Sequence, residues 1–145
     1  MTTSGQEEPL RQLTISLKDE IGADRCTLFF VDSVKKEVWS HIALGLEIAE
    51  IRLPIHRGVV GYVARTGQPL NLRDVYNDPR FDRTTDQRTG YRSKSMLTMA
   101  IRNDKRRVIG VFQALNKTSG LFTDEDKQTL KRYCDEAAAL MAAAG

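Results

Sequence analysis

The stretch at residues 57–64 has the clearest chemical potential in this 145-residue sequence. It reads RGVVGYVA, in which two glycines flank a turn into apolar residues at helical spacing. The first N–H groups of a helix have no partner within the helix, and the helix dipole favours a negative group at that end. Residues 58–61 can therefore hold an anion with main-chain donors alone. The same residues also fit a plain helix start with core valines, and both interpretations can hold together.

No catalytic or metal-binding pattern accompanies this stretch. The sequence contains no nucleophile elbow, no Walker loop and no HExxH motif. Cys26 and Cys134 stand far apart in no metal or redox spacing, and His41 and His56 are too few for a zinc site. We therefore expect a binding module rather than an enzyme, with no cofactor and no metal.

The composition is that of one folded domain in a cytoplasmic protein with reduced thiols. Hydrophobic residues make up 41% and charged residues 28%, with a net charge of +3. Acids interrupt the basic groups around residues 80–94 and 102–107, so we interpret them as solvated faces, with DNA binding a distant second. No apolar run approaches the ~20 residues of a membrane helix, and the N-terminus lacks a signal-peptide core. We expect a flexible segment at 1–8 and a single domain at 9–145, with no nucleic-acid or membrane partner.

Residue periodicity predicts the elements that must position the anion site. We expect helices at 9–21, at 57–64 and from Thr123 onward, where Asp126 can complete a capping box. Strands are expected at 26–31, 38–44, 48–53, 95–101 and 108–115, with a brief extended piece at 70–72. Residues 74–94 form a long connection with one or two short helices, and long loops in compact domains are usually functional.

These elements predict an α+β fold around a central antiparallel sheet. Hairpin-length links between successive strands favour antiparallel pairing. The two terminal helices should pack together on one face of the sheet, because each carries one apolar stripe. The 74–94 segment and the 57–64 helix are then left for the other face.

The sequence resembles the GAF family, specifically its cyclic-nucleotide-binding branch in phosphodiesterases and cyanobacterial-type adenylate cyclases. The resemblance runs from about Ala23 to Met141, and four stretches carry it: DRCTLFFVD at 24–32, the segment at 53–82 with RGVVGYVARTG, TGYRSKSML at 89–97, and VIGVFQALNK followed by FTDED at 108–126. Asn116, Lys117, Phe122 and Asp126 match the family's NK…F…DE signature. Lys127 departs from it, standing where a second acid is usual. By resemblance, Lys117 and Asp126 pair and clamp the last strand to the last helix without touching the ligand.

The resemblance also implies a set of ligand contacts. The backbone at Val59 and Val60 would meet the phosphate, and Trp39 would stack on the base. Further contacts to base, ribose or phosphate are implied at Thr27, Ser40, Asp82, Asp86, Thr89, Ser93 and Gln113. Asp82 departs from the family pattern, which is often aromatic there, and Gln113 replaces an acid found in some members. The structural alternatives are a core role for Trp39, helix caps at Thr89 and Ser93, and surface ion pairs at Asp82 and Asp86.

Taken together, these features predict a regulatory sensor of a cyclic nucleotide, cAMP or cGMP. Ser40 stands where guanine-binding members have an aspartate, which favours cAMP. We expect a homodimer through the terminal helices and a fused output domain in a longer parent protein. Three rivals remain: a GAF dimerisation module without nucleotide, a GAF sensor of another metabolite, and a sulfoxide reductase, for which two distant cysteines are not enough.

Overall fold

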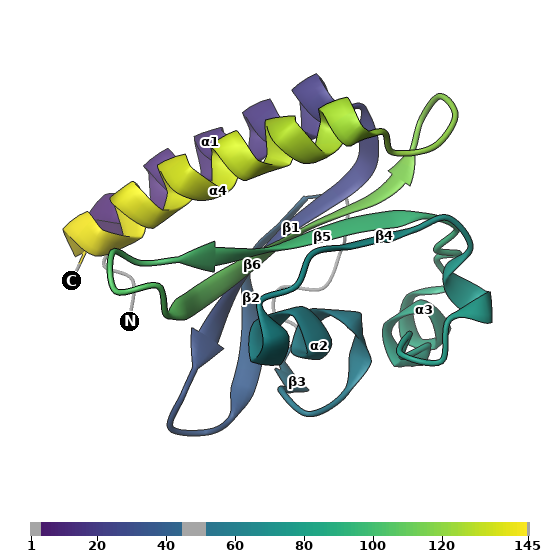
Figure 1. The fold of residues 1–145 in the computed structure, drawn as a ribbon, viewed down its shortest axis with the longest axis horizontal. Helices are drawn as coiled ribbons and strands as arrows, with labels where there is room; N and C mark the ends of the chain where they lie inside the picture. The colour runs from purple at the N-terminus through teal and green to yellow at the C-terminus, as the bar shows by residue number, and fades with distance from the viewer. Residues whose placement is uncertain (1–3, 45–51, 145) are drawn as a thin grey trace.

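The computed structural model describes residues 4–44 and 52–144, without the side chains of residues 4–6, 41–44, 85, 88, 89, 143 and 144 (Figure 1). In chain order, its elements are α1 (Ser4–Ile21), β1 (Ala23–Asp32), β2 (Glu37–Leu44), β3 (Arg52–Pro54), α2 (Gly58–Thr66), β4 (Leu70–Leu72), the 3-10 turn η1 (Val75–Asn77), α3 (Thr84–Thr89), β5 (Met96–Arg102), β6 (Val108–Lys117) and α4 (Asp124–Ala144).

The described strands form one antiparallel sheet in the order β3-β2-β1-β6-β5-β4. Its centre is the long pair of β1 and β6, in which Cys26 lies opposite Ala114 and Phe29 opposite Val111. The hairpins β1–β2 and β5–β6 follow from their short links, as predicted. The β1–β6 pairing joins residues far apart in the chain, so local patterns could not supply it. The α+β class with an antiparallel sheet is confirmed.

Alternation along β1 builds two separate cores on the two faces of the sheet. Leu28 and Phe30 point to the face covered by α1 and α4, whereas Phe29 points to the face covered by α2. Figure 1 shows α1 and α4 side by side on one face, with α2 and α3 on the other. The predicted layer order, with both terminal helices together, is therefore confirmed.

Polar contacts add to the apolar packing between α1 and α4. Leu17 is fully buried between the helices and the sheet. Near the end of α1, Glu20 accepts hydrogen bonds from Arg132 at 2.5 Å and from the Tyr133 hydroxyl at 2.7 Å. These bonds link the end of α1 to α4, beside the buried contacts between the two helices.

The start of the first helix differs most from its predicted position. Helix α1 begins at Ser4 rather than Pro9, so residues 4–8 belong to the helix. The proline removes a single N–H donor, while Glu7 in the first turn suits the positive end of the helix. The predicted strand at 48–53 is described only from Arg52, as β3, and the rest of it lies outside the described residues.

Gly110 on β6 is a point of close backbone approach, as its place in an apolar strand predicts. A Cβ atom built there would lie 2.8 Å from the Phe29 carbonyl oxygen. A side chain at this position would push the two central strands apart.

Among the described helices, none combines the length and apolar character that crossing a membrane requires.

Candidate functional site

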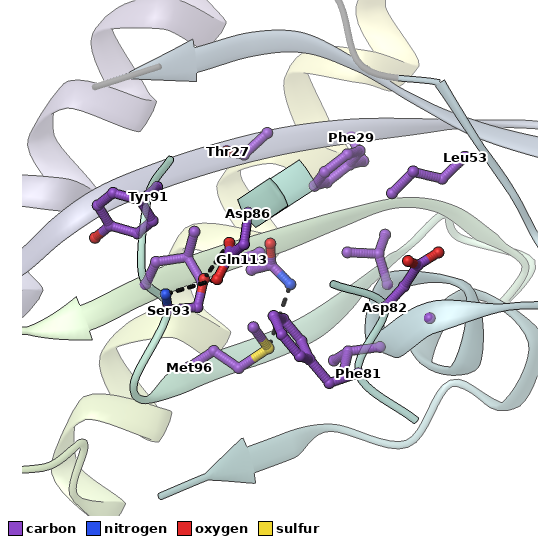
Figure 2. A pocket seen from close by; sticks show the side chains of 14 residues that line it. Thr27, Phe29, Leu53, Phe81, Asp82, Asp86, Tyr91, Ser93, Met96 and Gln113 are labelled. Atoms are coloured by element: carbon purple, nitrogen blue, oxygen red, sulfur yellow. Dashed lines mark hydrogen bonds between the residues drawn. The ribbon is translucent and has the colours of Figure 1, made fainter. Parts of the chain in front are cut away.

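A small cavity of about 60 Å³ lies between the sheet and the layer formed by α2, η1 and α3. Its floor comes from β1, β5 and β6, and its far side from the helical layer. The lining residues are Thr27, Phe29, Leu53, Gly58, Val59, Val60, Phe81, Asp82, Asp86, Tyr91, Ser93, Met96, Gln113 and Leu115. Figure 2 shows Asp86, Gln113 and Phe81 directed into this space.

The N-terminal turn of α2 forms one end of the cavity. Gly58 has a φ of 82°, a left-handed conformation that favours glycine, and Arg57 before it is extended. Arg57 makes no side-chain capping bond, so no side chain at that position takes up the first N–H groups of the helix. Val59 and Val60 are 3% and 5% exposed and line the cavity. The first residues of α2, without a side-chain cap from Arg57, therefore form part of the buried cavity lining.

Asp86 on α3 connects three segments of the helical layer. Its carboxylate accepts bonds from the Tyr76 hydroxyl at 2.7 Å, from the Ser93 amide at 2.8 Å and from the Ser93 hydroxyl at 2.9 Å. Asp86 is buried, so these three donors replace the water that it would otherwise bind. The hydrogen bond to Asp86 also raises the pKa of Tyr76. This cluster holds the layer shut over the cavity.

Asp82 stands at the edge of the cavity beside the α2 turn. It accepts hydrogen bonds from the Thr84 amide at 2.9 Å and the Thr84 hydroxyl at 2.5 Å, and it pairs with Arg57 Nε at 3.1 Å. The Thr84 bonds, together with the Arg57 charge, hold the pKa of Asp82 below its ordinary value. The side chain is therefore an anion at neutral pH, located where a ligand's negative group is expected.

The floor of the cavity has a polar centre within apolar strands. Gln113 Nε2 lies 3.6 Å from the Met96 sulfur and 3.4 Å from the Thr98 hydroxyl, both weak contacts. Thr27 lies directly opposite Gln113 in the β1–β6 register and is 1% exposed. A buried amide with long contacts can exchange them for a ligand polar group at small cost.

The structure does not bring every predicted contact to the cavity. The prediction that Trp39 lines it is wrong, because the indole packs on the opposite face of the sheet with Phe30, at 5.1 Å between ring centroids. Ser40, the next residue, faces the cavity side with Val38 and is buried, but it is not among the lining residues. The side chain of Thr89 lies outside the described part of the chain.

Sequence reasoning missed several of the apolar walls. Phe29 follows from Thr27 by the two-residue period of a strand, and the 74–94 segment visibly contains Phe81 and Tyr91. Met96 and Leu115 lie opposite each other across β5 and β6, which only the sheet register reveals. The aromatic wall of the cavity therefore comes from the connecting segment and β1, not from β2.

The signature residue Asn116 ties the connecting segment to the sheet. Its Oδ1 accepts from the Lys94 amide at 2.6 Å and the Ser95 amide at 3.1 Å, and its Nδ2 donates to the Tyr91 hydroxyl and the Arg92 carbonyl. Its φ of 58° is left-handed, a conformation that asparagine tolerates better than most residues. Asn116 thus anchors the segment just after the cavity-lining Tyr91.

The remaining signature residues join the sheet to α4. Lys117 Nζ lies 3.0 Å from Asp126 Oδ2 and donates to the Ile21 carbonyl at the end of α1 at 2.5 Å. Asp126 also accepts from the Thr123 amide, while its own amide donates to the Thr123 hydroxyl, so the predicted capping box is present. Phe122 is 4% exposed below this cluster. The structure places these residues away from the cavity lining, in agreement with a supporting role.

Comparisons with known proteins agree on family and fold. The sequence model of the GAF domain matches residues 7–141. The dual 3',5'-cyclic-AMP and -GMP phosphodiesterase 11A of Takifugu rubripes is 38% identical over 126 residues, covering 78% of this chain but only 14% of that protein. The chain thus spans a small part of this longer relative.

Solved structures show the same fold at low identity. The GAF domain of a phosphoenolpyruvate-protein phosphotransferase from Coxiella burnetii has a TM-score of 0.87 and 23% identity, covering 98% of this chain and 85% of that one. The free methionine-R-sulfoxide reductase of Neisseria meningitidis, solved with its substrate, has a TM-score of 0.80 and 22% identity, covering 96% and 79%. The same fold thus occurs both in a reductase and in the GAF domain of a phosphotransferase. Because the fold alone does not determine function, the function of this chain must be argued from the cavity.

Proposed function

This chain belongs to the GAF domain family, and on that premise we propose that it senses a cyclic nucleotide, bound in the cavity between the sheet and the α2–α3 layer. One observation carries the proposal: most of the contacts inferred from the sequence converge on a single cavity. These are Thr27, Val59, Val60, Asp82, Asp86, Ser93 and Gln113. They come from β1, α2, α3, β6 and the intervening segments, so their convergence is a property of the folded chain.

The chemistry of the lining suits the three parts of a cyclic nucleotide. The phosphate would meet the free N–H groups at the start of α2. The base would lie against apolar walls that include Phe81, since base–aromatic stacking contributes about 1–3 kcal/mol in nucleic-acid systems. Polar groups at Thr27 and Gln113 would meet the base edge. Phe81 takes the stacking role that the sequence assigned to Trp39.

Binding requires the cavity to expand. Its volume is about 60 Å³, whereas small-molecule pockets hold roughly 300–1,000 Å³. The Asp86 bonds to Tyr76 and Ser93 hold the layer in place, so the ligand must replace or loosen them. Only molecules in which these bonds are loosened can bind. The apparent affinity is therefore reduced in proportion to the fraction of such molecules. The loosening also couples binding to a movement of α3, which is what a sensor needs.

The base preference proposed is cAMP over cGMP. Ser40 lies on the cavity side of β2 where guanine-binding members carry an aspartate. A serine hydroxyl can donate or accept but carries no charge to select the guanine N–H groups. We further propose that the module controls a fused output domain and pairs with a second copy through its terminal helices, as a regulatory domain of a longer protein.

The small free volume of the cavity favours one second candidate, a GAF scaffold that binds no nucleotide. Thermal unfolding measured with and without ligand separates the two candidates. Ligand at 100 times its Kd stabilises the folded state by about 2.7 kcal/mol, which for a domain of this size raises Tm by about 5–10 °C. We expect that response with cAMP and a smaller one with cGMP.

Matched variants locate the effect. Gln113→Leu removes the polar centre of the cavity floor and should reduce the response to cAMP, while Trp39→Phe on the opposite face should retain it. The protein is also melted in the presence of unrelated metabolites. A response to one of these but not to either nucleotide would replace the proposal with a sensor of that metabolite, and no response to any compound would leave the scaffold.

A further inference from the structure

A second, open groove adjoins the cavity on its outer side. It has a volume of about 570 Å³, and four arginines line it, of which Arg80 pairs with Asp78 at 2.6 Å and Arg57 with Asp82 at 3.1 Å. The groove and the cavity share Gly58, Phe81 and Asp82 as lining residues. The two spaces are therefore adjacent at these three residues. The basic residues of the groove are His56, Arg57, Arg65, Arg80 and Arg83.

The Arg57–Asp82 ion pair lies where the two spaces adjoin. Arg57 Nε lies 3.1 Å from Asp82 Oδ2, with side-chain exposures of 57% and 20%. Asp82 also lies against the α2 turn, because a Cβ built on Gly58 would be 3.5 Å from the Asp82 Cβ. The carboxylate thus stands beside the helix N-terminus, in the position where the turn favours an anion.

We infer that Asp82 is a built-in competitor for the anionic group of the ligand, and that Arg57 passes from Asp82 to that anion when the ligand binds. The inference rests on the proposed function and adds to it a cation that binds the ligand. Displacing Asp82 opens a passage between the cavity and the groove beside Gly58 and Phe81. The joined space falls in the range of small-molecule pockets, which the cavity alone does not reach. A neutral ligand would gain nothing from this exchange, so the device selects a ligand with a negative charge.

Asp82→Asn tests the competitor directly. Asparagine still accepts the bond from the Thr84 amide, so the local turn is retained while the charge is lost. We expect the variant to bind cAMP about three- to tenfold more tightly, the range expected from an exposed ion pair and a helix-terminus interaction. Asp74→Asn is the control, because Asp74 is exposed, lies in the same connecting region and lines neither space. Its Kd should equal that of the unmodified protein.

Arg57→Gln in the Asp82→Asn background tests the cation. If Arg57 served only to neutralise Asp82, its loss in that background would change nothing. We expect instead that the double variant binds cAMP at least about threefold more weakly than Asp82→Asn alone, as loss of an exposed charge contact predicts.

Titration calorimetry of the full chain with cAMP at fixed ionic strength gives these Kd values. Tighter binding by Asp82→Asn, with weaker binding by the double variant, supports the inference. If the unmodified protein binds and Asp82→Asn binds equally or more weakly, or the double variant equals Asp82→Asn, the inference is overturned and the proposed function stands. If none of the proteins binds either cyclic nucleotide, both are overturned.

Discussion

Replacing Lys117 by alanine should destabilise the domain far more than an ordinary surface ion pair would predict. Lys117 donates to the Ile21 carbonyl at the end of α1 and pairs with Asp126 at the start of α4, so one ammonium group connects both terminal helices to β6. The two side chains are only 17% and 13% exposed. The variant leaves a largely buried carboxylate and a helix-end carbonyl without their cation.

The expected magnitude follows from this intermediate burial. Removing one partner of a fully buried pair costs about 3–5 kcal/mol, and an exposed pair contributes about 0–1 kcal/mol. Asp126 retains its bond from the Thr123 amide at 2.9 Å, which lowers the cost. We therefore expect a loss of about 2–3 kcal/mol, or a Tm lower by about 5–10 °C.

Urea denaturation followed by circular dichroism measures this loss. Lys131→Ala is the matched control, since Lys131 forms an i,i+4 pair with Asp135 whose side chains are 64% and 66% exposed. That variant should lose no more than about 0.5 kcal/mol. Equal losses for the two lysine variants would refute the argument that Lys117 clamps the helices to the sheet.

Further predictions concern the rest of the fold. Asn116→Ala should cost about 2–4 kcal/mol in urea denaturation, through four lost hydrogen bonds and a left-handed backbone, and Asn116→Gly should cost about 1 kcal/mol less. Burial raises the pKa of Cys26 to about 12 and that of Cys134 still further, so native protein should react with a thiol reagent at pH 8 only as fast as it opens; immediate labelling would contradict this. The hydrogen-bonded Arg80 guanidinium holds the pKa of Asp78 below its ordinary 3.8. The stability that this ion pair contributes is therefore present above pH 3.8 and lost as the pH falls below that value. Asp78→Asn should therefore lower the free energy of unfolding at pH 7 but not at pH 2. Trp39→Phe should leave the Kd for cAMP unchanged in calorimetry, because the indole is outside the cavity.

Local sequence signals predicted the elements whose ends are set by neighbouring residues. The capping box of Thr123 and Asp126 occurs where the pattern places it. Such features depend on a few consecutive residues, so the sequence alone suffices. The predicted start of α1 is wrong because the prediction places Pro9 in the first turn, where proline is favoured, whereas Pro9 lies inside the helix.

The faces of β2 show what local patterns could not decide. Val38, Trp39 and Ser40 all suit a buried strand, and alternation says only that the outer two share a face. Which face contains the cavity depends on β1 and α2, and β1 shifts its register against β2 between Leu28 and Phe29. The family resemblance assigned Trp39 to the ligand, whereas packing in the folded chain places it with Phe30.

The Asp86 cluster was equally inaccessible from the sequence. Its three bonds join Tyr76, Asp86 and Ser93, which are separated by irregular chain whose path no periodicity describes. The sequence predicts only a long connection at 74–94, whereas the fold shows that Asp86 ties Tyr76 and Ser93 together within it. Expansion of the cavity against these bonds is therefore the step on which the account depends.

The most direct test is an amide NMR titration of the isotope-labelled chain with cAMP. The account predicts shift changes that saturate together at the α2 turn (58–60), at the Asp86–Ser93 segment and at Gln113, with little change in the exposed outer face of α4. Changes confined to the terminal helices, or no saturable change at any concentration of cAMP or cGMP, would contradict nucleotide binding in this cavity.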